Sequence, residues 1–134
     1  IGRNILNCPI CKNEPMITLE LNEVEIDYCL SCKGIWLDAG ELELLLGSDV
    51  ESTEFLNSFT PDTKSKEKKL KCPICNKKME KVMVVGEKEI TIDKCKNEHG
   101  IWFDAGELED VLKMGTLGKD NKVLILLKDM FGKK

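Results

Sequence analysis

The sequence has few aromatic residues, a single histidine and no long apolar run. It contains one histidine, and aromatic residues make up 5% of its 134 residues. Its longest apolar run, residues 123–127, is far shorter than the roughly 20 residues that a membrane-spanning helix needs. No secretory segment precedes the first cysteine pair, so we expect a soluble, cytoplasmic protein without a membrane partner.

The cysteine pattern argues against disulfides and for a repeated metal-binding unit. The seven cysteines are an odd number, which fits poorly with a fully paired disulfide framework. Residues 29–42 return as residues 95–108, and a Cys-Pro-Ile-Cys motif stands upstream of each copy, at 8–11 and 72–75. Each unit of about 40 residues is too small to be held by a hydrophobic core alone. We therefore expect bound metal to supply the missing stability.

The cysteines and the histidine divide into two sets of four with none left over. The sets are Cys8, Cys11, Cys29 and Cys32, and Cys72, Cys75, Cys95 and His99. Counting back from the tryptophan of each copy, Glu98 stands where Cys32 stands, and His99 follows it. Because a Cys-x3-His pair is a workable zinc half-site, we expect His99 rather than Glu98 to complete the second set.

This set of ligand types predicts two Zn²⁺ ions per chain. Iron also suits a cage of four sulfurs, but a partner site with three cysteines and one histidine favours zinc. Four protein ligands leave no open coordination position for water or substrate, so both sites are predicted to be structural. We predict no catalytic residues and no further cofactor.

Alternation of apolar and polar residues predicts a β-hairpin in each unit, with strands at 16–21 and 24–28 and at 81–85 and 89–94. One face of the first hairpin is apolar, and the other carries Glu25 and Asp27 and is expected to face water. A short helix should follow at 39–46, capped by Asp38 and Glu41.

Two pairs of residues in the repeated segments each allow both a structural and a functional interpretation. Asp104 and Glu107 repeat the capping pair of the first unit, and capping explains their spacing better than acid–base catalysis does. Trp36 and Trp102 either pack beneath the hairpins and shield the metal or serve as exposed anchors for a partner. Core packing is favoured, because each unit needs a core and aromatic residues are few.

The order Cys-Pro-x-Cys, hairpin, Cys-x-x-Cys-x-Gly-Ile-Trp-Leu-Asp-x-Gly-Glu-Leu resembles the transcription-factor-IIB-type zinc-finger family of small prokaryotic proteins. The resemblance covers residues 8–46 and, less strictly, 72–113. It implies a zinc-ribbon fold with Cys8, Cys11, Cys29 and Cys32 as ligands, and Cys72, Cys75 and Cys95 match in the second unit. His99 departs from the family pattern.

The expected fold is a small metal-stabilised α+β protein with two tandem zinc ribbons, each made of two knuckles, a β-hairpin and a short helix. The first ribbon spans residues 1–47 and the second 72–115. A linker at 48–71 contains a possible short helix with Phe55 and Phe59, followed by a lysine-rich spacer. An apolar C-terminal helix at 119–134 either docks on the ribbons or forms the seam of a homodimer.

Charge and ligand accounting together favour a non-enzymatic zinc protein that binds a protein partner. Two zinc ions contribute +4 and seven thiolates −7, so the formal net charge of −4 becomes about −7 with metal bound. That charge disfavours nucleic-acid binding in transcription, which is the first alternative. The second is a thiol-redox or metal-dependent enzyme, which would need a free thiolate or an open metal position.

Overall fold

The computed structural model describes residues 5–21, 23–46, 54–55, 57–62, 69–85 and 89–115. The first repeat contains strands β1 (Ile17–Leu21), β2 (Val24–Tyr28) and β3 (Ile35–Asp38), and helix α1 (Glu41–Leu46). The short strand β4 (Thr60–Pro61) follows. The second repeat contains β5 (Glu80–Val85), β6 (Glu89–Lys94), β7 (Gly100–Phe103) and helix α3 (Glu107–Gly115).

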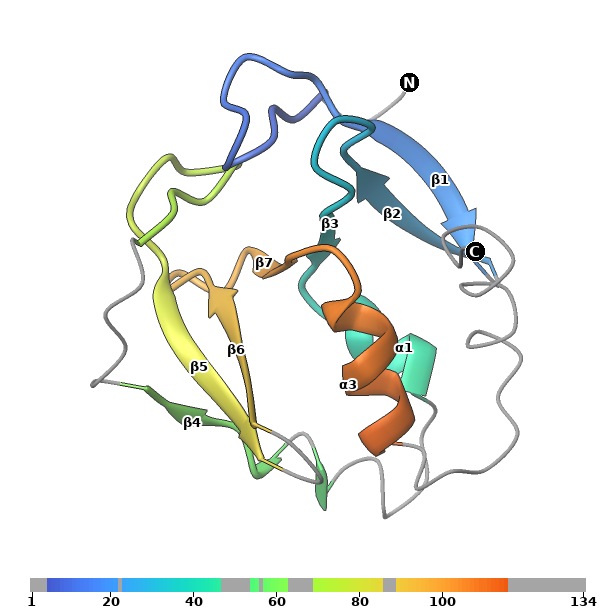
Figure 1. Cartoon of the computed structure of the whole chain (residues 1–134), viewed down its shortest axis with the longest axis vertical. Coiled ribbons are helices and arrows are strands. Elements are labelled where there is room, and N and C mark those ends of the chain that lie inside the picture. Colours follow the sequence, from blue (N-terminus) through green and yellow to red (C-terminus); the bar gives the residue numbers. More distant parts are fainter. Residues whose placement is uncertain are drawn as a thin grey trace.

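The strands of both repeats form one antiparallel sheet. Its order is β1-β2-β3-β7-β6-β5-β4, so the two halves meet where β3 pairs with β7 (Figure 1). We call residues 5–46 the first ribbon and residues 69–115 the second ribbon. The predicted hairpins are confirmed by the pairing of β1 with β2 and of β5 with β6. Neither the third strand of each ribbon nor its pairing across the repeat was expected from the sequence.

The pairing of β3 with β7 relates the two ribbons by a local two-fold axis. Trp36 lies opposite Trp102, which is its own counterpart in the repeat. Leu37 lies opposite Ile101, and Ile35 lies opposite Phe103. Because each residue faces the partner that a two-fold rotation requires, the axis passes between the two tryptophans.

One face of the sheet carries the main hydrophobic core beneath the helices. Helices α1 and α3 contact each other and pack against β2, β3 and β6, and Figure 1 shows them side by side between the two hairpins. Val24, Ile26 and Tyr28, predicted to face the core, are buried there together with Leu42 and Leu112. The short helices therefore bury their apolar sides against the sheet that both repeats build.

On the opposite face, six residues lie in a row across six strands, each opposite the next. In spatial order they are Thr18, Asp27, Trp36, Trp102, Asp93 and Lys81. Both tryptophans are fully buried, which confirms that they belong to the core. The expectation that Asp27 faces water is wrong, since it is 2% exposed. The two indoles and the cysteine-bearing loops pack into a second core on this face and exclude water from it.

The ends of this row differ between the ribbons. In the second ribbon Nζ of Lys81 lies 2.7 Å from Oδ2 of Asp93, and both side chains are almost fully buried. In the first ribbon the hydroxyl of Thr18 donates to Oδ1 of Asp27 at 3.2 Å. A buried carboxylate needs such a partner, because an unpaired charge inside a protein costs several kcal/mol, on the order of 3–5 when a partner is removed.

Several expectations shift or fall outside the described residues. Helix α1 begins at Glu41 rather than at residue 39, because Gly40 has a φ of 88° and Asp38 still belongs to β3. Within the expected linker, Thr60–Pro61 forms β4, and the rings of Phe55 and Phe59 meet edge to face at 5.2 Å. The lysine-rich stretch 63–68 and the tail at 119–134 lie outside the described ranges. None of the helices within those ranges is long and apolar enough to cross a membrane.

Candidate metal centres

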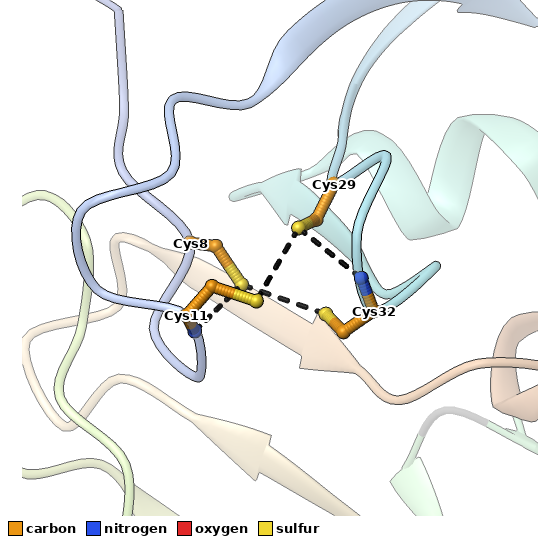
Figure 2. A group of neighbouring side chains, drawn as sticks. All are labelled: Cys8, Cys11, Cys29 and Cys32. Atoms are coloured by element: carbon orange, nitrogen blue, oxygen red, sulfur yellow. Dashed lines mark hydrogen bonds between the residues drawn. The ribbon is translucent and has the colours of Figure 1, made fainter.

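The first candidate centre joins two loops of the first ribbon. Cys8 and Cys11 come from the loop before β1, and Cys29 and Cys32 come from the turn between β2 and β3. Figure 2 shows the four side chains pointing toward one another, and their sulfur atoms all lie within 4.8 Å. The hairpin therefore brings together residues that are about 20 positions apart in the chain, as the sequence predicted.

The second candidate centre has the same layout with an imidazole in place of one sulfur. Its members are Cys72, Cys75, Cys95 and His99, again with ligand atoms within 4.8 Å of one another. Nδ1 of His99 lies 3.9 Å from Sγ of Cys72 and 3.5 Å from Sγ of Cys95. His99 is thus placed where Cys32 lies in the first ribbon.

A change in the preceding turn accompanies the histidine. In the first ribbon the N–H of Lys33 donates to the carbonyl of Cys29, and Lys33 has a φ of 70°. In the second ribbon the turn closes one residue earlier, because the N–H of Glu98 donates to the carbonyl of Cys95 and Glu98 has a φ of 62°. Glu98 therefore forms the turn and stays exposed, while the next residue points its side chain at the sulfurs.

The spacing of these atoms fits a tetrahedral zinc ion. Zinc–sulfur bonds of about 2.3 Å place two sulfurs about 3.8 Å apart at the corners of a tetrahedron. The observed Sγ–Sγ separations are 3.6 Å for Cys8 and Cys32, 3.8 Å for Cys11 and Cys29, and 3.7 Å for Cys75 and Cys95. A disulfide would bring two sulfurs to about 2.05 Å. The donor sets therefore fit metal coordination, and all seven cysteines are free of disulfides.

Backbone N–H groups point at the sulfurs and stabilise their negative charge. The N–H of Cys11 lies 3.4 Å from Sγ of Cys8, and the N–H of Cys32 lies 3.5 Å from Sγ of Cys29. In the second ribbon the N–H of Asn97 donates to Sγ of Cys95 at 3.4 Å, and its side-chain amide approaches Sγ of Cys75 at 3.8 Å. The amide of Asn97 was not singled out from the sequence, because a single asparagine in a loop carries no such signal.

Local surroundings shift the pKa values of individual thiols in opposite directions. Burial raises the pKa of the Cys8 thiol and raises that of Cys72 to about 12. The backbone N–H of Lys77 is the main cause that lowers the pKa of Cys75, to about 6. Negative charge on one sulfur opposes ionisation of the next, so four close thiolates need a cation among them. A divalent metal would supply it.

Both ribbons use the same side-chain network to connect the strand beside the metal site to its helix. The indole N–H of Trp36 donates to Oδ1 of Asp38 at 2.8 Å, and Oε1 of Glu41 accepts from the N–H of Asp38 at 2.7 Å. The second ribbon repeats both bonds at 2.9 Å. The Glu half of the predicted capping box is therefore confirmed. The aspartates also satisfy buried indole N–H groups, a role that the sequence did not indicate.

Two glycines beside the metal sites allow the ribbons to approach closely. A Cβ atom on Gly34 would lie 2.2 Å from the ring of Trp102, and one on Gly100 would lie 2.2 Å from the carbonyl oxygen of Leu37 and 2.6 Å from the ring of Trp36. Each tryptophan therefore packs over the glycine of the other ribbon. In the sequence, Gly-Ile-Trp indicates only a sharp turn of the chain after the second cysteine pair of each unit. The contact between glycine and tryptophan joins distant segments, so no local sequence pattern predicts it.

Comparison with known proteins agrees with this geometry. The model of the transcription factor zinc-finger family, a zinc ribbon of the transcription factor IIB type, matches twice, at residues 7–48 and 71–114. No curated protein and no solved structure matches the chain. The two matches and the two four-residue groups indicate two zinc ions per chain. The matched segments cover most of the sequence, and each contains one complete group of four candidate ligands. The chain therefore belongs to the transcription factor zinc-finger family.

Proposed function

We propose that the protein is a non-enzymatic interaction module whose two zinc ions hold the sheet together. Cys8, Cys11, Cys29 and Cys32 would bind one ion. Cys72, Cys75, Cys95 and His99 would bind the other. The observation that carries this proposal is that each group offers four protein ligands at tetrahedral spacing. Four such ligands leave no coordination position for a substrate, and every cysteine is used, so neither metal catalysis nor thiol exchange has a free group.

The surface around the first zinc site supports a protein as the partner. Ile10 lies between Cys8 and Cys11, and Leu30 lies between Cys29 and Cys32; their side chains are 43% and 53% exposed. Ile5, three residues before Cys8, is 78% exposed. Large apolar side chains left in water around one rigid site are typical of protein contact surfaces.

A matched pair of variants tests this partner surface. The position equivalent to Leu30 in the second ribbon is Lys96, so Leu30→Lys introduces a residue that the fold already accepts at that position. Tagged zinc-loaded protein should capture a protein from its own cell extract after RNase and DNase treatment, and Leu30→Lys should lose it. The control is Leu44→Lys, which changes an exposed leucine on helix α1, away from the cysteines, and this variant should still capture the protein. Capture that disappears with nuclease treatment would contradict a protein partner.

Nucleic-acid binding is a second candidate because of the charge around the second zinc site. Lys71, Lys77, Lys78 and Lys96 are all exposed on the loops that carry the second group. The family description, transcription factor zinc-finger, also suggests transcription. Against it, the formal net charge is −4, and phosphate binding draws its affinity from excess positive charge. A gel shift that weakens with salt and is lost in Lys77→Glu/Lys78→Glu would favour this candidate over the first.

A further inference from the structure

The second metal centre adjoins the place where the two ribbons pair. His99 directly precedes Gly100, the first residue of β7, and β7 pairs with β3 of the first ribbon (Figure 1). The last pair of that ladder places Asp38 opposite Gly100. The pairing between the ribbons therefore ends one residue away from a candidate metal ligand.

A backbone hydrogen bond extends this pairing to His99 itself. The N–H of Ala39, which follows β3, donates to the carbonyl oxygen of His99 at 3.0 Å. His99 therefore has its side chain in the second centre and its carbonyl group on the first ribbon. The equivalent of Ala39 in the second ribbon is Ala105, and its N–H has no backbone acceptor among the described residues. Within those residues the link thus runs from the first ribbon to the second centre.

The indole of Trp36 packs on the same turn. A Cβ atom on Gly100 would lie 2.6 Å from the ring of Trp36, so the ring lies directly against the backbone beside His99. The carbonyl oxygen of Gly100 also accepts from the N–H of Cys95, another member of the second group, at 3.0 Å. Trp36 is fully buried, and its indole N–H is bound to Asp38. A fixed side chain of the first ribbon therefore supports the turn from Cys95 to His99.

The segment that makes these contacts is close to the first metal centre. Strand β3 begins three residues after Cys32, and the N–H of Cys29 donates to the carbonyl of Gly34 at 3.0 Å. Cys8 and Cys29 belong to the same buried cluster as Trp36. Because a ribbon of this size needs its metal to fold, zinc in the first centre should fix the position of β3.

We propose that Ala39 and Trp36 position His99 for the second metal centre, so that zinc in the first centre raises the zinc affinity of the second. Neither residue is a ligand. Together they hold the backbone of His99 before the metal arrives, which lowers the ordering cost of binding. Because binding free energies are linked, zinc in the second centre raises the affinity of the first by the same factor. The inference rests on the proposed function in one respect, which is that both groups bind zinc.

A matched pair of proline variants tests the role of Ala39. Proline has no N–H, so Ala39→Pro removes the hydrogen bond to His99, whereas Ala105→Pro makes the same change without removing such a bond. Both alanines are exposed and lie in the same Asp-Ala-Gly-Glu sequence. In competition with a zinc chelator, Ala39→Pro should lower the zinc affinity of the second centre by about fivefold or more, and Ala105→Pro should leave it unchanged.

The ligands of the remaining zinc identify the centre that is affected. When a chelator has removed half of the zinc from Ala39→Pro, X-ray absorption should show a reduced nitrogen contribution, because the centre with His99 empties first. A general loss of stability would weaken both centres and would not select against the nitrogen ligand. Equal nitrogen contributions in half-depleted Ala39→Pro and Ala105→Pro would overturn the positioning role.

Disabling each centre in the full chain tests the coupling. Cys8→Ser/Cys11→Ser should lower the zinc affinity of the second centre by about tenfold or more. Cys72→Ser/Cys75→Ser should lower the affinity of the first centre by a similar factor. Unchanged affinity of the remaining centre would overturn the inference and leave two independent structural zinc sites. A wild-type protein that binds zinc at neither group would contradict the proposed function, and this inference with it.

Discussion

His99 is the one member of the second group that is not a cysteine, and it occupies the position that a fourth cysteine occupies in the first ribbon. Its Nδ1 atom lies among the sulfurs, whereas Glu98 forms the left-handed turn and is exposed. The neighbouring residues therefore have separate tasks. One offers a ligand atom, and the other shapes the backbone that presents it.

Replacing these two neighbours should separate the tasks. His99→Ala removes a ligand, so the zinc content should fall toward one ion per chain, as measured by elemental analysis of protein purified without added metal. Glu98→Ala should leave zinc content unchanged, with a small loss of stability from the left-handed φ. The opposite pattern would assign the fourth ligand to Glu98.

A second prediction at this scale concerns Lys81, whose equivalent in the first ribbon is Thr18. Lys81→Met removes the buried ion pair with Asp93 and should lower the free energy of unfolding by about 3–5 kcal/mol. Lys81→Thr recreates the pair formed by Thr18 and Asp27 and should cost less than half as much. Chemical denaturation of the zinc-loaded proteins measures both. Equal losses would contradict the equivalence of the two pairs, because the threonine hydroxyl would then not replace the lysine ammonium group beside Asp93.

At the scale of elements, the contact between β3 and β7 depends on the two glycines beneath the tryptophans. Any Cβ at Gly100 collides with the carbonyl oxygen of Leu37 and the ring of Trp36, so strands β7 and β3 would have to separate. Gly106 is the matched control. Its φ of 84° is strained for alanine, but nothing lies within 4 Å of the place that an alanine methyl group would occupy.

The two alanine variants should therefore differ in the size of their effect. Gly100→Ala should lower the unfolding free energy by about 3 kcal/mol or more through overpacking, and Gly106→Ala by about 1–2 kcal/mol through backbone strain alone. Thermal unfolding of the zinc-loaded proteins would measure the difference. A Gly100→Ala protein as stable as Gly106→Ala would contradict close packing of the two ribbons.

The elements differ in how far the sequence could predict them. Alternation of apolar residues located the hairpins, and the spacing of Cys8, Cys11, Cys29 and Cys32 located the first group, because both patterns are local. Strands β3 and β7 have four residues each and pair with each other across 66 positions, from Trp36 to Trp102. No local sequence pattern therefore predicts them. The burial of Asp27 was missed for the same reason, since Asp27 lies opposite Trp36 of β3, on the face where the second core forms.

At the scale of the whole molecule, the two ribbons form one sheet and share both cores. The second core contains cysteines from both metal groups together with Trp36 and Trp102, so the environment of each ion is continuous with that of the other. Small units of this size gain their folding energy from metal, on the order of 10 kcal/mol for each structural zinc ion. Loss of either ion should therefore weaken the sheet as a whole.

Zinc K-edge X-ray absorption, combined with elemental analysis of protein purified without added metal, measures the composition of both sites at once. The four-sulfur site and the site with one imidazole predict two zinc ions per chain and seven sulfur ligands for each nitrogen ligand. In the His99→Ala protein the nitrogen contribution should disappear and the zinc content should approach one. Iron in place of zinc, or intramolecular disulfides in a metal-free protein, would contradict two structural zinc sites.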